Sequence, residues 1–134
     1  GDGINQLKPY HGVYIFMNNG KNEFTKQYFF PINGCIKAMA NDFDKDGDLD
    51  IAAIGFFTDN AQPEEGFIFL ENKGKLDFQP YSLPVDTKFN KATTMDIGDI
   101  DNDGKIDIIL GHGFLGNKAL DEKKPLFLVL KNKF

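Results

Sequence analysis

Two short stretches of the 134-residue chain carry aspartate on alternate positions. The first, over 42–50, reads Asp-Phe-Asp-Lys-Asp-Gly-Asp-Leu-Asp, and the second, over 99–107, reads Asp-Ile-Asp-Asn-Asp-Gly-Lys-Ile-Asp. Glycine at the sixth position of each allows a tight loop, which brings carboxylates at alternate positions onto one side. Ca²⁺ is a hard ion that takes six to eight oxygen ligands in proteins. We therefore expect each stretch to hold one Ca²⁺, giving two sites.

The expected ligands follow from the positions within each stretch. Position 7 should bind through its main-chain carbonyl, because the side chain of Lys105 cannot be a ligand and Asp48 is then an optional extra. Four carboxylates packed closely repel one another without a cation. The predicted metal residues are Asp42, Asp44, Asp46, Asp48 and Asp50 in the first loop, and Asp99, Asp101, Asp103, Lys105 and Asp107 in the second.

Different metals and different loop types suit the two stretches less well. Mg²⁺ usually keeps several waters and avoids sites made of protein ligands alone, and zinc prefers His or Cys, which neither loop contains. An EF-hand needs Glu at position 12 and flanking helices, but position 12 is Ala53 or Leu110 within apolar, strand-like runs. The remaining alternative is an Asp-rich turn whose carboxylates cap backbone amides, and two copies in register make it the weaker choice.

Composition restricts the class of protein and the partners. The net charge is −5 and all 15 basic residues are lysine, so the forked guanidinium that reads phosphate and guanine is missing and we expect no nucleic acid partner. Two Ca²⁺ ions, with four positive charges, would reduce the net charge from −5 to −1. No window approaches the roughly 20 apolar residues of a membrane span, so no membrane insertion is expected. The single cysteine, Cys35, cannot form an intrachain disulfide and is expected to be a small core residue.

The elements that position the loops repeat along the chain. Residues 12–20 resemble residues 66–74, and a further copy begins at residue 126. Each copy is an apolar run followed by an Asn-rich turn, as in a β-hairpin. The period in the mid-fifties predicts a repeated four-stranded unit. Strands are expected over 13–17, 23–30, 36–40, 51–57, 67–71, 76–82, 92–98, 106–111 and 126–131.

The segments before the two loops, 36–40 and 92–98, are rich in small residues. Small side chains suit strands that crowd near a central axis, although an ordinary sandwich strand would also accept them. Because no segment shows a helical period over 11 or more residues, the predicted class is all-β.

These residues resemble the FG-GAP/VCBS repeat, the calcium-loop blade of integrin α-subunit propellers and of many bacterial secreted proteins. Residues 38–51 and 95–108 fit its Asp-x-Asp-x-Asp-Gly-x-x-Asp loop and the apolar strand that follows, and 13–20 fit its third strand. The resemblance implies an antiparallel β-propeller in which the metal loop joins the first and second strands of a blade. It also implies adhesion, ligand binding or scaffolding at an extracellular or cell-surface location, with a protein or carbohydrate as ligand.

The repeat count predicts two to two-and-a-half blades in a single repeat region. We assign a blade part to 1–31, a full blade to 32–86 and a partial blade to 87–134. Because propellers need about four to eight blades, we expect either the remainder of a longer propeller chain or a homo-oligomer that closes the ring.

No arrangement of residues in the sequence predicts catalysis. The two histidines, His11 and His112, and the only serine, Ser82, lack the neighbours of a nucleophile motif. We therefore expect a non-catalytic module with weak calcium sites of about 10⁻⁴–10⁻³ M. Two alternatives stay open: a non-catalytic portion of a secreted hydrolase or lyase acting on polysaccharide, and a structural subunit that oligomerises. A cleft holding Cys35, His112 and a free Asp would favour an enzyme.

Overall fold

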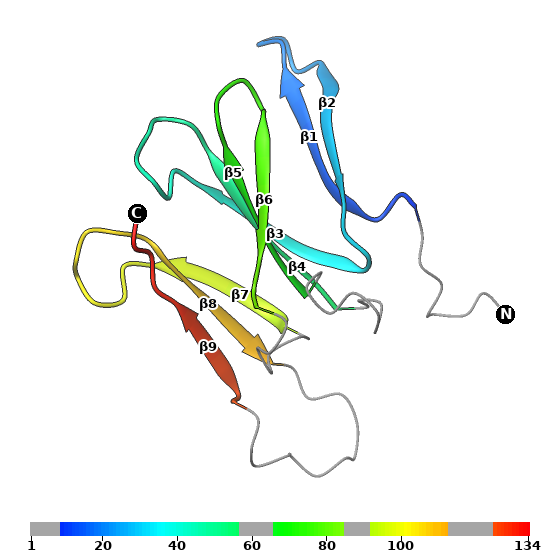
Figure 1. The fold of residues 1–134 in the computed structure, drawn as a ribbon. Coiled ribbons are helices and arrows are strands. Elements are labelled where there is room, and N and C mark those ends of the chain that lie inside the picture. The colour runs from blue at the N-terminus through cyan, green and yellow to red at the C-terminus, as the bar shows by residue number, and fades with distance from the viewer. Residues whose placement is uncertain (1–8, 57–65, 85–91, 113–124) are drawn as a thin grey trace, which may run out of the picture.

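A computed structural model describes residues 9–56, 66–84, 92–112 and 125–134 of the chain. Within these ranges the regular structure consists of nine β-strands (Figure 1). They are β1 (Gly12–Asn18), β2 (Phe24–Pro31), β3 (Cys35–Asn41), β4 (Asp50–Gly55), β5 (Phe67–Asn72), β6 (Phe78–Ser82), β7 (Ala92–Gly98), β8 (Asp107–His112) and β9 (Phe127–Leu130). All nine predicted strands are present, and the ends that can be compared differ from the predicted ones by at most two residues. The predicted strand 51–57 ends at Phe57, which lies outside the described residues.

The described strands form three antiparallel sheets in chain order. The first sheet pairs β1 with β2, the middle sheet has the order β3-β4-β5-β6, and the third has the order β7-β8-β9. The all-β prediction is confirmed, and sheets of two, four and three strands agree with partial propeller-like blades. The blade bounds given above, including their parts outside the described residues, stay a prediction.

The middle and third sheets repeat the same register. Ile51 lies opposite Leu70 in the middle sheet, and Ile108 lies opposite Leu130 in the third. The pairing of β3 with β4 and that of β7 with β8 both shift by one residue near the start of the first strand. The repeat seen in the sequence therefore corresponds to a repeated pattern of strand pairing in the structure.

The hairpin turns need backbone conformations that favour glycine. Gly20 and Gly74 have φ of 84° and 100° in the turns after β1 and β5. The side chain of Asn18 accepts a hydrogen bond from the Gly20 amide at 3.0 Å, and that of Asn72 accepts one from the Gly74 amide at 3.0 Å. The predicted Asn-rich turns are confirmed at both places.

Two apolar clusters join neighbouring sheets. One lies between the first and middle sheets and consists of Val13, Ile32, Ile51, Ala53, Ile68 and Leu70. The other lies between the middle and third sheets and consists of Phe43, Ala52, Ile54, Phe67, Phe69, Ala92, Met95, Ile108 and Leu110. β4 contributes to both clusters on alternate residues and is buried along its whole length. Burial on both faces explains why 51–54 is a continuous apolar run instead of an alternating one.

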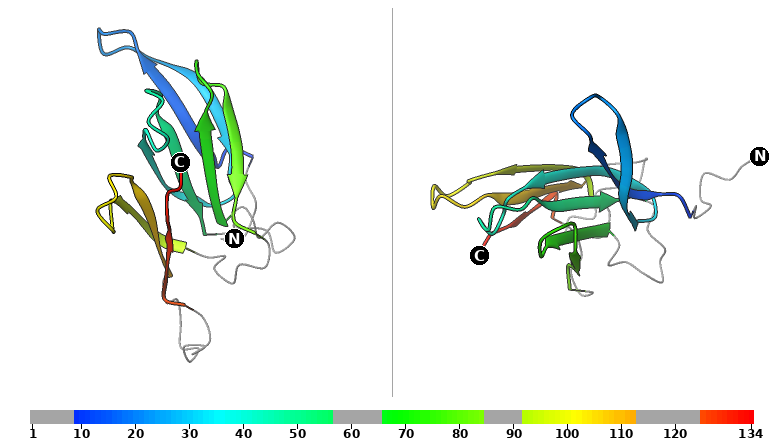
Figure 2. Two further views of the ribbon diagram at one scale, coloured as in Figure 1. Left: turned by 60° about the vertical axis from the view of Figure 1, so that its left-hand side comes forward. Right: turned by 90° about the horizontal axis from the view of Figure 1, so that it is seen from above.

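The strands that precede the acidic loops lie at corresponding edges. β3 and β7 are each the first strand of their sheet, and the ammonium of Lys37 on β3 donates to the carbonyl oxygen of Met95 on β7 at 2.6 Å. Whether these strands line a central axis stays a prediction. The turns that follow them emerge on the same side of the molecule, near the end of the described chain at residue 134 (Figure 1), and the views of Figure 2 agree.

Candidate metal centre

The first acidic loop joins β3 to β4 and is folded by hydrogen bonds to its own carboxylates. The carboxylate of Asp42 accepts from the amides of Asp46 and Gly47 at 3.1 and 3.0 Å. Asp44 also accepts from the Asp46 amide, at 3.2 Å. Gly47 has φ of 98°, which agrees with the backbone requirement predicted at position 6.

The second loop, between β7 and β8, repeats the two hydrogen bonds to the first aspartate. The carboxylate of Asp99 accepts from the amides of Asp103 and Gly104 at 3.1 and 2.8 Å. Gly104 has φ of 82°, and Asn102 at position 4 has φ of 58° where Lys45 has 64° in the first loop. Two sequences that differ at positions 2, 4, 7 and 8 therefore fold into the same loop.

The ninth-position aspartates are fully buried and bridge two elements. Asp50 accepts from the Phe43 amide at 3.1 Å and from the Asn72 amide at 2.8 Å. Asp107 accepts from the Ile100 amide at 3.1 Å and from the Asn132 amide at 2.8 Å. Asp50 thus ties its loop to the end of β5, and Asp107 ties its loop to the segment that follows β9.

The structure brings together three of the predicted ligands in each loop. One oxygen from each of Asp42, Asp44 and Asp50 lies within 4.8 Å of the others, and Asp99, Asp101 and Asp107 form the equivalent group. Among the described residues, these are the groups of three whose spacing suits a metal ion. Ligands of one small ion lie at such separations.

The other predicted ligands lie outside these two groups. The carboxylate of Asp46 accepts from the Asp48 amide at 2.8 Å, and that of Asp103 accepts from the Lys105 amide at 2.9 Å. These side chains shape the loops in the structure. Their coordination of a metal, like that of the carbonyls of Asp48 and Lys105, stays a prediction.

The electrostatics of the first loop favour a bound cation. Burial raises the pKa of Asp50, and the charges of Asp44 and Asp46 raise it further, while hydrogen bonds from the Asn72 and Phe43 amides lower it. A divalent cation would offset this repulsion, and a donor set made only of carboxylate oxygens suits a hard ion. The residues present therefore fit the expected metal.

Sequence reasoning missed the two asparagines that hold the closing carboxylates. Their side chains differ in what they bind: Asn72 donates through Nδ2 to the carbonyl oxygen of Leu49 in its own loop at 3.2 Å, whereas Asn132 donates to that of Phe43 in the first loop at 2.7 Å. The sequence contained a signal for them, because each asparagine follows the apolar run of its repeat, as Asn18 does in the first hairpin.

The comparisons with known proteins agree with the repeat. A family model described as an FG-GAP-like repeat matches residues 42–110, just over half of the chain. That span contains both acidic loops and the strands between them. No curated protein and no solved structure matches the chain.

Proposed function

The chain belongs to the FG-GAP-like repeat family, and we propose that it is a calcium-binding module of the β-propeller type. In this proposal the metal is structural. Asp42, Asp44 and Asp50 would hold one Ca²⁺, and Asp99, Asp101 and Asp107 the other, with Asp46, Asp103 and the carbonyls of residues 48 and 105 as further ligands. The observation that carries the proposal is the pair of carboxylate groups at equivalent places.

Bound calcium would stabilise the folded state and would not take part in a reaction. A cation that binds the assembled loop and not the unfolded chain stabilises the folded state by mass action. Each loop is tied through its ninth aspartate to the end of β5 or to the segment that follows β9, so the ion would brace these parts together. FG-GAP-like repeats are generally non-catalytic structural modules, which supports a binding or scaffolding role here.

We propose further that the module packs against additional sheets of its own kind. Tyr14 and Phe16 on β1 are 38% and 51% exposed, whereas Ile68 and Leu70, at the equivalent positions of β5, are 7% and 0% exposed. The difference supports a missing neighbour for the first sheet. The additional sheets would belong to a longer propeller chain or to further copies.

The third sheet, at the other end of the molecule from the first, also has an exposed apolar side chain. Phe127 on β9 is 64% exposed, whereas its equivalent Phe67 on β5 is 6% exposed. Exposed apolar faces of this kind mark interaction sites. We therefore propose an adhesive or scaffolding role at the cell exterior, toward a protein or carbohydrate.

Thermal unfolding in three buffers tests the calcium proposal. We expect the melting temperature to rise by several degrees on going from a chelator to about 5 mM Ca²⁺, and to rise much less with the same concentration of Mg²⁺. A protein carrying both Asp50→Asn and Asp107→Asn serves as the matched control, whose melting temperature should not depend on calcium. Equal melting temperatures of the unaltered chain in chelator and calcium would overturn the proposal.

A further inference from the structure

We infer that the two loops are unequal cation sites, because Lys131 forms an ion pair with a carboxylate of the second loop, whereas no described lysine forms one with a carboxylate of the first. The first loop should therefore fill at lower Ca²⁺ concentration than the second. The inference rests on the proposed calcium binding, and it identifies which residue sets the order of filling.

The contact that carries the inference lies at the end of β9. The ammonium of Lys131 forms an ion pair with the carboxylate of Asp101. Asp101 is one of the three carboxylates grouped in the second loop. An ion bound there must displace the ammonium from Asp101 or share that carboxylate with it. Because the lysine and aspartate side chains are 51% and 36% exposed, water screens the pair and the competition should be moderate.

The equivalent position of the middle sheet carries the opposite charge. Glu71 precedes Asn72 as Lys131 precedes Asn132, and only 6% of its surface is exposed. Its carboxylate accepts from the ammonium of Lys73 at 2.6 Å and from the hydroxyl of Tyr81 at 2.9 Å. Glu71 thus forms the ion pair with the nearby lysine, and the charge of Asp44 attracts that ammonium only at longer range. Within the described part of the chain, Asp44, the counterpart of Asp101, forms no ion pair.

The loops themselves add to the difference. Position 7 is Asp48 in the first loop and Lys105 in the second, so the first loop has five carboxylates and the second has four. Lys45 belongs to the first loop by sequence, but its ammonium lies 4.0 Å from the place where a Cβ on Gly104 would stand. Positive charge therefore gathers around the second loop, which should weaken its hold on a divalent cation.

A calcium titration followed by nuclear magnetic resonance reads the two loops separately. The backbone amides of Gly47 and Gly104 each donate to the first aspartate of their own loop, so each reports on one loop. In the unaltered chain we expect the Gly47 signal to reach its midpoint at about tenfold lower Ca²⁺ than the Gly104 signal. In Lys131→Gln, the Gly104 midpoint should fall about three- to fivefold and the Gly47 midpoint should not move.

Two further variants sharpen the comparison. Lys131→Glu places at the second loop the charge that Glu71 places at the first, and should lower the Gly104 midpoint by about tenfold. Lys73→Gln is the control, because Lys73 forms its ion pair with Glu71 and not with a carboxylate of either loop. The Gly104 midpoint should stay unchanged in this variant. The amide signals of β4 and β8 show directly whether each variant is folded.

The possible failures are distinguishable. If neither glycine signal moves up to about 20 mM Ca²⁺, the calcium proposal and this inference both fall. If both signals move but with equal midpoints, or if Lys131→Gln leaves the Gly104 midpoint where it was, calcium binding stands and only the inference is overturned.

Discussion

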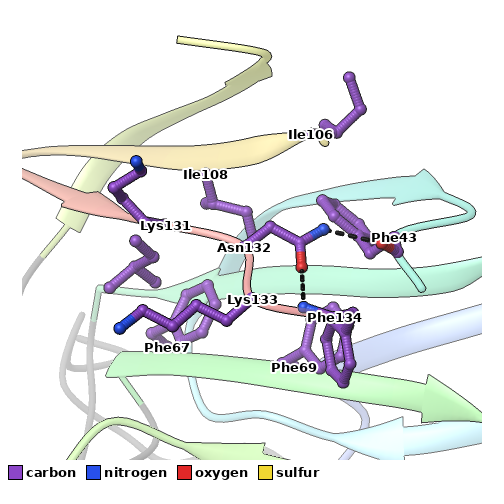
Figure 3. A pocket seen from close by; sticks show the side chains of 10 residues that line it. Phe43, Phe67, Phe69, Ile106, Ile108, Lys131, Asn132, Lys133 and Phe134 are labelled. Carbon is purple, nitrogen blue, oxygen red and sulfur yellow. Dashed lines mark hydrogen bonds between the residues drawn. The ribbon is translucent and has the colours of Figure 1, made fainter. Parts of the chain in front are cut away.

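The side chain of Asn132 donates through Nδ2 to the carbonyl oxygen of Phe43 at 2.7 Å, across 89 positions of the chain (Figure 3). The same asparagine accepts from the Phe134 amide at 2.8 Å and donates its own amide to Asp107 at 2.8 Å. One residue therefore fixes the closing carboxylate of the second loop and contacts the backbone of the first. This relationship joins the two candidate metal loops physically.

Asn132→Ala should destabilise the protein by about 1–2 kcal/mol, because it removes both side-chain hydrogen bonds, the one to the Phe43 carbonyl and the one from the Phe134 amide. Urea unfolding without calcium measures the change in the free energy of unfolding. Lys21→Ala, at an exposed turn position, is the control and should change stability by less than about 0.5 kcal/mol. Equal effects of the two substitutions would show that the contact between the loops carries no stability.

Phe43→Ala and Ile100→Ala compare the same loop position in two surroundings. Phe43 is 3% exposed and packs edge-on against Phe69 with ring centroids 5.4 Å apart, whereas Ile100 is 47% exposed. We expect the first substitution to cost about 3–5 kcal/mol and the second less than about 1 kcal/mol. Denaturant unfolding measures both. A cost for Ile100→Ala close to that for Phe43→Ala would contradict the packing described for the two loops.

Gly47→Ala isolates the backbone conformation of the first loop. No atom lies within 4 Å of a Cβ built on Gly47, so the expected cost of about 1 kcal/mol is conformational and comes from its φ of 98°. Gly98→Ala is the matched control, since it has equal space and no positive φ, and it should change stability by under about 0.5 kcal/mol. Thermal unfolding in a chelator measures both. If Gly47→Ala is no worse than Gly98→Ala, the loop does not hold the described conformation.

Cys35 should react slowly with alkylating reagents. Burial raises the pKa of its thiol, and the hydrogen bond from the Lys37 amide opposes this only in part. A raised pKa leaves less reactive thiolate near pH 8, so iodoacetamide should modify the folded protein about tenfold more slowly than the chain in urea. The rate should climb as the pH passes through the raised pKa. Equal rates in the folded and unfolded states at pH 8 would contradict the burial of this side chain.

Much of the fold could be predicted because its physical signals are local. Continuous apolar runs marked the buried strand over 50–55, and Asn-rich turns with glycine marked the hairpins. The repeat then placed the acidic loops between strands at equivalent edges. These features depend on side chains close together in the sequence, so a single sequence was enough to find them.

The parts that could not be predicted depend on long-range contacts. The amide of Asn132 reaches Asp107 across 25 positions, and the ion pair of Lys131 with Asp101 crosses 30. No local sequence pattern predicts either contact. The different burial of Phe43 and Ile100 was equally hidden, because it is decided by whether a neighbouring sheet covers the loop. The grouping of the first, third and ninth aspartates without the fifth also required coordinates.

Calorimetric titration of the chelator-treated protein with Ca²⁺ at 25 °C tests the central claim most directly. The account predicts two sites per chain, with dissociation constants of about 10⁻⁴–10⁻³ M. It also predicts that Asp50→Asn and Asp107→Asn each remove one site and leave the other. Absence of saturable heat in the unaltered chain, or stoichiometry that neither substitution changes, would contradict the account.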